Sequence, residues 1–412
     1  MRRATLVALL GAACAPGQDP PVENAAGSGS TSLVPDAGTT GDGAETGDGG
    51  ESTTASSEST GAPPSDLPAF PLVRDSSQIK FVSDGELTIA GVTTEIRFYR
   101  NLAYACGEEG HYTFAVVSPA ATVEPTPLWI FLRAGGGGYY DHDGIYHHGS
   151  QADDPIGNLE FSGDTLVEPL RRSAEAGGVP RDTLLGRRLA EGYRFMMPAP
   201  CDHDVFSGVG QPYPRSPTPN TVDGLLATMA AVDFTLANFE TSSVTAHGTS
   251  AGAFGAFGLA YAYAQEETHL RAAIMDSGLA THRNRDVFEL GCTFAQLNDP
   301  ALEFSLLEEK IGPFFAHADL LPEVAIANGF DAVPLYVLAG GDDPRCCSPT
   351  VTVSEAYPDN CSFVHGGVTE AVADTAPNPH RSVVMAGMGH VLTDDEGPWV
   401  DDIDAWLAAV AP

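Results

Sequence analysis

The fold is decided by the stretch Ser243-Val244-Thr245-Ala246-His247-Gly248-Thr249-Ser250-Ala251-Gly252-Ala253-Phe254-Gly255-Ala256. Its first four residues are typical of a buried strand, and the residues from Ala253 onward are typical of a helix with small side chains on one side. Between them stands the motif Gly-x-Ser-x-Gly, with Ser250 at its centre. In a strand–turn–helix context this motif indicates a nucleophile elbow, in which a serine sits on a strained turn between small neighbours. We therefore predict that Ser250 is a nucleophile; the alternative is a glycine-rich connection with an incidental serine.

Short apolar runs on both sides of this stretch predict further strands that are buried on both faces. The predicted strands cover residues 128–132, 194–197, 243–246, 272–275, 335–338 and 382–385. Helical patterns lie between several of them, over residues 183–191, 221–239, 253–265 and 401–410. Alternation of strands and helices predicts an α/β fold of the α/β-hydrolase-like kind, with a mostly parallel central sheet and helices on both faces.

The pattern differs in two regions of the folded part. Residues 78–99 alternate apolar and polar side chains around turn signals such as Ala90-Gly91, which predicts an N-terminal antiparallel hairpin. Residues 111–117 are typical of one more strand. Residues 279–330 fit the alternation poorly, so we expect a helical insertion or a lid there.

A serine hydroxyl is a poor nucleophile unless a base, itself oriented by an acid, takes its proton. In this fold the three residues follow in the order serine, acid, histidine. His390 comes directly after the last predicted strand and is the predicted base, while His365 and His380 are weaker candidates. The strand at 335–338 leads to two adjacent acids, Asp342 and Asp343, and either of them is a candidate to orient the base.

Four consecutive glycines, Gly135-Gly136-Gly137-Gly138, follow the predicted strand at 128–132. Such a run is costly in chain entropy and indicates a backbone that approaches something closely. Backbone N–H groups from this segment are candidates to hold an oxyanion. A phosphate-binding loop is a poor alternative because no Gly-Lys-Ser/Thr ending follows, and a flexible linker is the other alternative.

Several segments together resemble the pectin acetylesterase/Notum family of carboxylesterases. They are Leu128 to Tyr140 with its glycine run, Ala105-Cys106-Gly107 with Tyr112, Pro200-Cys201-Asp202-His203-Asp204-Val205-Phe206-Ser207-Gly208, and Gly248-Thr249-Ser250-Ala251-Gly252. The resemblance implies Ser250 as nucleophile, Asp342 or Asp343 as acid and His390 as base. It also implies an oxyanion hole made by the backbone N–H groups of Gly138, Tyr139 and Ala251.

The sequence departs from that family's pattern in two places. Tyr139-Tyr140 stands where the family has an aromatic residue followed by cysteine, so one family disulfide is expected to be absent or rewired. The glutamine that often follows the acid is also missing, and Arg345-Cys346 lies nearby instead. These changes leave the three catalytic positions occupied and leave the substrate open.

Metal-capable side chains cluster just after the glycine run and near residue 203. They are Asp141, His142, Asp143, His147, His148, Asp153, Asp154, Asp202, His203 and Asp204. Such side chains can bind a metal, but we favour a polar rim around the mouth of the site. We predict no metal and no cofactor, and we regard Tyr140, His142 and His203 as candidates for contact with substrate.

The chain opens with Met1-Arg2-Arg3, a short apolar run over residues 4–13, and Cys14. This pattern is typical of a secretory signal, and the run is shorter than the roughly 20 residues that span a bilayer. Small residues before Cys14 favour a lipoprotein signal over residues 1–14, although Gly11 stands where such signals usually carry leucine. We expect export and a lipid anchor on Cys14 that holds the protein to an outer or cell-surface membrane; the alternative is a secreted protein.

Residues 15–66 are rich in small, polar and acidic residues and contain no lysine or arginine. They bury too little apolar surface to offset chain entropy, so we expect a disordered tether before a catalytic domain over residues 67–412. The whole chain has 55 acidic against 20 basic residues and a formal net charge of −35. Such a charge argues against nucleic acid as a partner.

Six cysteines follow Cys14, and an even number in an exported protein favours disulfides over free thiols. Zinc is the competing interpretation, but no Cys-x-x-Cys pair is present. The pattern as a whole predicts a serine carboxylesterase that hydrolyses O-acyl esters, with O-acetyl groups on polysaccharide favoured by the resemblance. The alternatives are a lipase-like or polyester hydrolase with the same three residues, and a surface-binding lipoprotein without activity.

Overall fold

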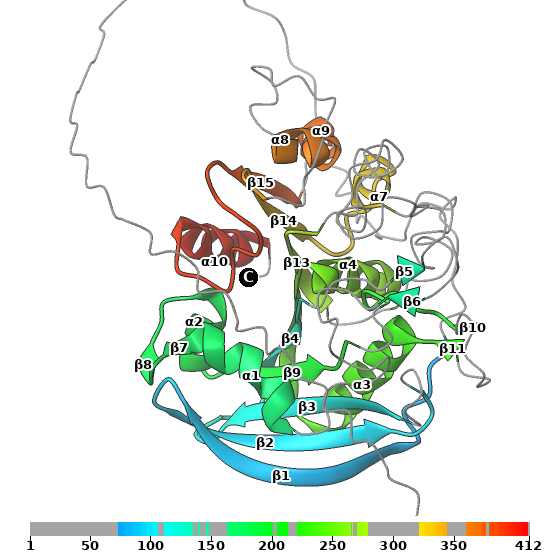
Figure 1. Ribbon diagram of the computed structural model, residues 1–412, viewed down its shortest axis with the longest axis vertical. Coiled ribbons are helices and arrows are strands. Elements are labelled where there is room, and N and C mark those ends of the chain that lie inside the picture. The colour runs from blue at the N-terminus through cyan, green and yellow to red at the C-terminus, as the bar shows by residue number, and fades with distance from the viewer. Residues whose placement is uncertain are drawn as a thin grey trace, which may run out of the picture. The chain divides into compact units, whose positions relative to one another are not determined.

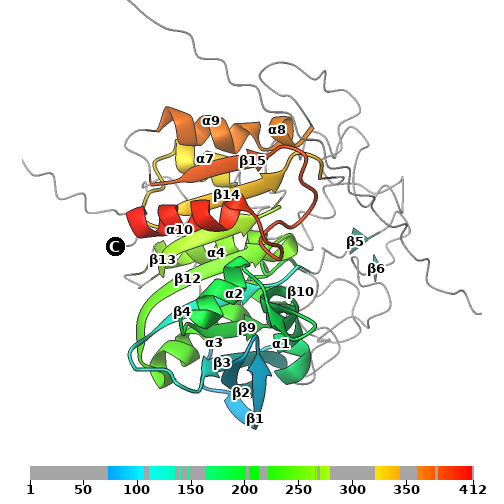
Figure 2. The same ribbon diagram turned by 90° about the vertical axis from the view of Figure 1, so that its left-hand side faces the viewer.

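The chain folds around a nine-stranded sheet in a computed structural model, with the strand order β1-β2-β3-β9-β4-β12-β13-β14-β15. The bounds are β1 Ile79–Ile89, β2 Val92–Asn101, β3 Tyr112–Pro119, β9 Arg194–Pro198, β4 Thr126–Leu132, β12 Thr241–Thr249, β13 Leu270–Asp276, β14 Leu335–Gly340 and β15 Arg381–Met385. Figure 2 shows the sheet from β15 at the top to β1 at the bottom. Three short ribbons accompany it: β5 (Tyr139–Tyr140) with β6 (Tyr146–His147), β7 (Glu175–Ala176) with β8 (Val179–Pro180), and β10 (Gln211–Pro212) with β11 (Thr221–Val222).

The described residues all belong to one compact unit within Ser59–Pro412. They are residues 73–105, 111–134, 139–140, 146–147, 163–200, 204–212, 221–264, 266, 270–278, 321–343, 360–375 and 379–410. The signal expected over residues 1–14, the tether expected over 15–66 and the start of the predicted domain at residue 67 lie outside them.

The strands pair in two ways. From β9 through β4, β12, β13 and β14 to β15, every neighbouring pair is parallel. β1, β2, β3 and β9 pair antiparallel. The predicted N-terminal hairpin is present as β1 and β2, which are joined by Ala90 and Gly91 with φ values of +50° and +80°. Positive φ at both turn positions is what a two-residue hairpin turn with the native strand twist requires.

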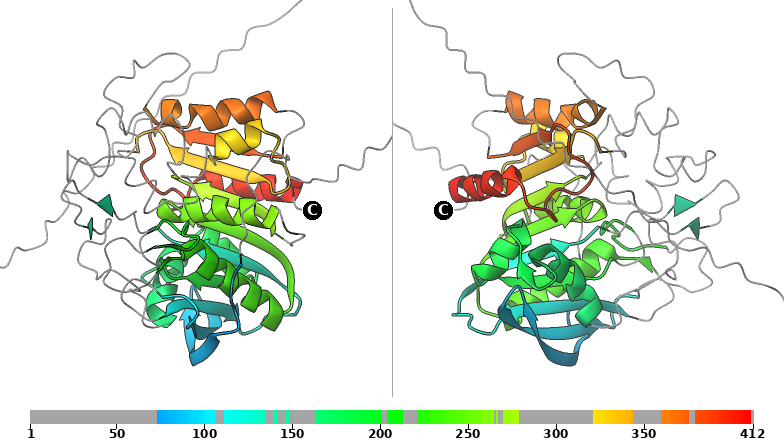
Figure 3. Two further views of the ribbon diagram at one scale, coloured as in Figure 1. Left: turned by 90° about the vertical axis from the view of Figure 1, so that its right-hand side faces the viewer. Right: turned by 60° about the vertical axis from the view of Figure 1, so that its left-hand side comes forward.

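Helices cover both faces of the sheet. Their bounds are α1 Gly163–Ala174, α2 Leu184–Ala190, α3 Gly224–Asn238, α4 Ala251–Ala264, α7 Pro322–Ala327, α8 Asn360–Val364, α9 Gly366–Asp374 and α10 Pro398–Val410. Figure 1 shows α1, α2 and α10 on one side of the sheet and α3, α4, α7 and α9 on the other. The two faces can be compared in the two views of Figure 3. The α/β-hydrolase-like fold predicted from the sequence is therefore confirmed.

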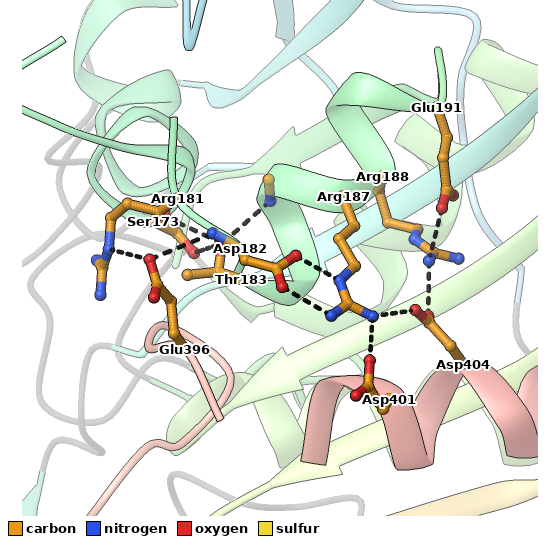
Figure 4. Close-up of polar contacts among 11 residues, drawn as sticks. Ser173, Arg181, Asp182, Thr183, Arg187, Arg188, Glu191, Glu396, Asp401 and Asp404 are labelled. Atoms are coloured by element: carbon orange, nitrogen blue, oxygen red, sulfur yellow. Dashed lines mark hydrogen bonds and ion pairs between the residues drawn. The ribbon is translucent and has the colours of Figure 1, made fainter. Parts of the chain in front are cut away.

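A network of ion pairs fastens the C-terminal helix α10 to α2 (Figure 4). Arg188 donates to Asp404 at 2.6 Å and to Glu191 at 3.1 Å, and its side chain is only 7% exposed. Its guanidinium also lies over the rings of Trp129, at 5.7 Å, and Tyr193, at 5.2 Å. A buried cation with carboxylate partners and aromatic faces holds the two helices in one arrangement.

Differences from the sequence-based prediction lie in the helices. The predicted helices at 183–191, 221–239, 253–265 and 401–410 are present with shifted ends as α2, α3, α4 and α10. α8 escaped prediction because five residues are too few for a period to show. Of the expected insertion at 279–330, only residues 321–330 are described, and they contain α7. Among the described residues no helix is both long and apolar enough to cross a bilayer.

Candidate active site

Ser250 lies on the turn between β12 and α4, where the parallel strands end. Its φ is +51°, in the left-handed region that few residues other than glycine adopt. The N–H of Ser250 donates to the carbonyl of Asp276 at 2.8 Å, and the carbonyl of Ser250 accepts from the N–H of Ala253 at 3.0 Å. Backbone strain of this kind persists where the surrounding contacts hold it in place, and it concentrates at functional sites.

The two glycines of the motif are required by close backbone contacts. A Cβ on Gly248 would lie 1.9 Å from the carbonyl oxygen of Gly252. A Cβ on Gly252 would lie 1.9 Å from the carbonyl oxygen of Leu132, at the end of β4. Neither position can accept a side chain unless the backbone moves. The glycines thus let the helix begin directly against the sheet, with Ser250 on the sharp turn between them.

His390 and Asp343 are paired through their side chains. His390 Nδ1 lies 2.5 Å from Asp343 Oδ2, and the Asp343 side chain is fully buried. An ionised carboxylate only accepts hydrogen bonds, so Nδ1 carries the proton and Nε2 keeps its lone pair. Nε2 is buried and makes no hydrogen bond within the described part of the chain. The pair therefore presents an oriented imidazole that can take up a proton on Nε2.

Of the two adjacent acids, Asp343 is the one whose carboxylate reaches the imidazole of His390. Asp342 is exposed, and its backbone N–H donates to the carbonyl of Met388 at 2.8 Å. A Cβ on Gly340 would lie 2.3 Å from that same carbonyl oxygen. The loop after β14 is thus packed closely against the loop after β15, and this contact brings the acid and the base together.

The two weaker histidine candidates are both buried, with His365 1% and His380 6% exposed. His380 Nδ1 accepts from the N–H of Leu335 at 3.0 Å, and its Nε2 donates to the carbonyl of Phe330 at 2.5 Å. Burial lowers the pKa of His380. Both ring nitrogens of His380 are therefore bonded to backbone groups. The backbone carbonyl of His365 accepts a hydrogen bond from the N–H of Thr369 in α9.

A buried polar network beneath the His390 loop was not predicted from the sequence. At its centre is Asp276, the last residue of β13, which is fully buried. Its Oδ2 accepts from the N–H groups of Leu392 and Thr393 at 2.8 and 2.7 Å, and from the hydroxyl of Thr393 at 2.8 Å. Its Oδ1 accepts from the hydroxyl of Ser277 at 2.9 Å. Burial raises the pKa of the Asp276 carboxyl, and these hydrogen bonds oppose that rise by stabilising the charged form.

The same network includes His247, in the strand that leads to Ser250. His247 Nε2 lies 2.9 Å from the hydroxyl oxygen of Thr393, and Nδ1 accepts from Trp129 Nε1 at 3.4 Å. Because the hydroxyl proton of Thr393 points to Asp276, Nε2 of His247 is the donor and the ring is neutral. Burial lowers the pKa of His247 to about 3, which agrees with a neutral ring.

The structure describes the remaining predicted site residues only in part. Ala251 is the first residue of α4, where a backbone N–H has no partner within the helix and the helix dipole favours negative charge. Tyr139 and Tyr140 form strand β5, which pairs with β6. Gly138, His142, His203 and Cys14 lie outside the described residues.

Asp204 is the member of the metal-capable cluster whose side chain the structure describes. Its carboxylate accepts from the backbone N–H groups of Phe206, Gly208 and Gly224 at 2.7 to 2.8 Å. Burial raises the pKa of Asp204 to about 7, against the effect of those three donors. Asp204 thus caps the start of α3, while β6 includes the backbone of His147 and the rest of the cluster lies outside the described residues.

Cysteine pairing is described at one position. Cys361, in α8, is bonded in a disulfide, and its Sγ lies 3.6 Å from the backbone oxygen of Asp343. The other cysteines lie outside the described residues, so the pairing predicted from their even number stays a prediction.

No family model matches the sequence, and no curated protein matches it. The resemblance to the pectin acetylesterase/Notum family therefore rests on the quoted segments of sequence alone.

Solved structures similar to this chain include three hydrolases. The S-formylglutathione hydrolase from Agrobacterium tumefaciens is 11% identical with a TM-score of 0.46, and the match covers 81% of this chain and 100% of that one. The glucuronoyl esterase from Solibacter usitatus is 15% identical with a TM-score of 0.43 and coverage of 82% and 88%. The acetyl xylan esterase from Paenibacillus sp. R4 is 12% identical with a TM-score of 0.41 and coverage of 81% and 88%.

Proposed function

We propose that this protein is a serine carboxylesterase, with Ser250 as nucleophile, His390 as base and Asp343 as the acid that orients the base. The observation that carries the proposal is the hydrogen bond of 2.5 Å between His390 Nδ1 and the buried Asp343 carboxylate. It fixes the tautomer in which Nε2 is the proton acceptor. The strained turn of Ser250 lies at the end of β12, in the same parallel set of strands.

The chemistry is a two-step acyl transfer. His390 Nε2 takes the proton of the Ser250 hydroxyl, whose oxygen attacks the ester carbonyl and forms a tetrahedral intermediate. The N–H of Ala251 at the start of α4, with backbone N–H groups of Gly138 and Tyr139, stabilises the oxyanion. The imidazolium then gives its proton to the leaving alcohol. In the second step His390 takes a proton from water, which attacks the acyl-enzyme carbonyl, and the Ser250 oxygen regains a proton from His390 as the acid leaves.

The substrate class we propose is short O-acyl esters outside the cytoplasm, with O-acetyl groups on polysaccharide as the preferred case. Support for the acyl length and for the polysaccharide comes from the resemblance to pectin acetylesterase/Notum sequences. Tyr140, His142 and His203 are the residues we assign to substrate contact. No cofactor or metal is needed for the proposed steps, because base, acid and oxyanion donors are all supplied by the chain.

Activity profiling tests the proposal. Purified wild type and Ser250→Ala are assayed on nitrophenyl esters of graded acyl length, on acetylated xylan or pectin, and on an aliphatic polyester. We expect wild type to prefer acetyl or similarly short groups, and Ser250→Ala to lose roughly 10³-fold or more in kcat. A preference for long chains or polyester would instead support the lipase-like alternative. Full activity of Ser250→Ala would refute the proposed nucleophile, and lack of all activity in wild type would support a surface-binding protein.

We also propose that the chain is exported and held to a membrane through a lipid on Cys14, with residues 15–66 as the tether. The basic start, the short apolar run and the cysteine after small residues support this proposal. Expression of wild type and Cys14→Ser in a bacterial host tests it by fractionation. Wild type should sediment with membranes and Cys14→Ser should not; equal solubility of the two forms would contradict the anchor.

A further inference from the structure

Two loops carry the catalytic groups of the proposed esterase, and both are bonded to the same residue, Asp276. The backbone carbonyl of Asp276 accepts the N–H of Ser250 at 2.8 Å. Its side-chain Oδ2 accepts the N–H groups of Leu392 and Thr393 at 2.8 and 2.7 Å. Those two residues follow His390 by two and three positions. A single residue at the end of β13 thus touches the nucleophile turn with its backbone and the base loop with its carboxylate.

Ser277 adds a second connection of the same kind. Its hydroxyl donates to Asp276 Oδ1 at 2.9 Å and accepts the N–H of Val391, the residue after His390, at 2.9 Å. Ser277 and Val391 both have positive φ, at +58° and +59°. Non-glycine residues persist in that region when surrounding contacts hold them, so these bonds select the conformation of the loop immediately after the base.

Burial strengthens the hydrogen bonds of the Asp276 side chain. Asp276 and Thr393 are both 0% exposed, so the hydrogen bonds to this carboxylate have no competition from solvent. A buried carboxylate that receives four donors is satisfied in its charged form, and losing its charge or one donor leaves polar groups unpaired. His247 and Trp129 continue the network below Thr393 and leave little freedom for the hydroxyl.

We propose that Asp276, acting through Ser277 and Thr393, is a positioning residue. It holds the Ser250 turn and the His390 loop in a fixed position relative to each other. The proposal rests on the serine esterase function proposed above. Asp276 acts through backbone groups on either side and does not itself take the proton. Its role is to keep the base aligned with the nucleophile, because proton transfer in such a pair depends steeply on distance and angle.

Variants that weaken the network while keeping the shape of its members test this role. Thr393→Val removes the hydroxyl that bonds Asp276 and His247, and Thr393→Ser restores it without the methyl group. Asp276→Asn keeps the shape of the side chain and removes its charge. The matched control is Thr228→Val, which removes an equally buried hydroxyl that bonds Tyr112 at 3.0 Å in the core.

Two readouts are measured on the full-length protein: kcat and KM on a short-chain ester, and amide hydrogen exchange of residues 248–252 and 389–394. Thr393→Val and Asp276→Asn should lower kcat by roughly tenfold to a hundredfold with KM little changed. In both variants the rate of amide hydrogen exchange should rise in residues 248–252 and in residues 389–394. Thr393→Ser should recover kcat to within about threefold of wild type, and Thr228→Val should keep kcat even if its Tm falls.

The proposal is overturned if Thr393→Val and Asp276→Asn keep wild-type kcat, or if exchange rises in residues 389–394 while residues 248–252 stay as protected as in wild type. The exchange arm does not depend on catalysis. If wild type hydrolysed no ester, the proposed function would fail, yet exchange would still decide whether Asp276 couples the two loops.

Discussion

His390 Nδ1 and Asp343 Oδ2 lie 2.5 Å apart, although their residues belong to separate loops after β14 and β15. The carboxylate is buried and faces only one edge of the imidazole, so the opposite edge, Nε2, is left as the proton acceptor. This relationship distinguishes Asp343 from Asp342, its neighbour in the sequence.

Asp343→Asn should lower kcat/KM by roughly 10² to 10⁴, because an amide no longer fixes the imidazole tautomer or stabilises the imidazolium. Asp342→Asn is the matched control. Its carboxylate is exposed, and its backbone N–H, which bonds Met388, is kept, so kcat/KM should stay within about threefold of wild type. Steady-state kinetics of the two variants decides; equal losses in both would contradict the assignment of the acid.

Gly252→Ala should destabilise the protein by at least ~2 kcal/mol and abolish activity, because the added methyl meets the Leu132 carbonyl oxygen. Gly258→Ala, in the same helix, is the control. Its methyl would lie 3.3 Å from a Leu225 methyl group that can move, and alanine favours the helix by about 1 kcal/mol. Urea unfolding should show a large loss for the first variant and little change or a gain for the second. Similar stabilities would contradict the close packing of α4 on β4.

Protonation of His247 should lower the free energy of unfolding as the pH falls. Burial lowers its pKa from 6.5 to about 3, so the unfolded chain binds a proton that the folded chain does not. The contribution of a neutral buried His247 is fully present above pH 6.5 and is lost as the pH falls toward 3, by about 2 kcal/mol between pH 6.5 and 5.

His247→Gln isolates this contribution. The variant should be less stable at pH 7, because glutamine cannot reproduce both hydrogen bonds of His247, to Thr393 and Trp129. Between pH 6.5 and 5, however, its free energy of unfolding should lose less than that of wild type. Urea unfolding at several pH values measures this loss. A loss equal to that of wild type would mean that His247 is not the group that takes up the proton.

Arg188→Met should lower the free energy of unfolding by about 1–3 kcal/mol. It removes a buried cation and leaves the carboxylates of Glu191 and Asp404 without that partner. Arg171→Met is the control, because Arg171 is 40% exposed and its closest ion pair, with the 41% exposed Glu168, lies at the surface. Exposed pairs of this kind contribute little to stability, because solvent and salt screen the two charges. Thermal unfolding compares the two. A smaller loss for Arg188→Met than for Arg171→Met would contradict the role of the network in Figure 4.

Much of the fold could be predicted because its signals are local. Buried parallel strands appear as short apolar runs, and the glycines around Ser250 mark a backbone contact that tolerates no side chain. Three of the four predicted helices, α3, α4 and α10, have 13 to 15 residues, and α2 was predicted although it has only seven. α8 and α9 are short, and α1 has Pro169 within it, so their sequences resemble loops.

The candidate site was harder to predict where it depends on contacts between distant segments. Asp342 and Asp343 look alike in sequence, and only the packing of the β14 loop on the β15 loop distinguishes them. Asp276 looked like the ordinary end of a buried strand, although its position at the carboxyl end of β13 was a usable signal. Its partners lie 116 and 117 residues away, and no local pattern encodes such pairs.

The most direct test of the central claim is mass spectrometry after treatment with a fluorophosphonate. Wild type should gain one phosphonyl group, and fragmentation of the peptide should place it on Ser250. Asp343→Asn should be labelled much more slowly, and Ser250→Ala should not be labelled. A phosphonyl group on another residue, or equal labelling of wild type and Ser250→Ala, would contradict the account.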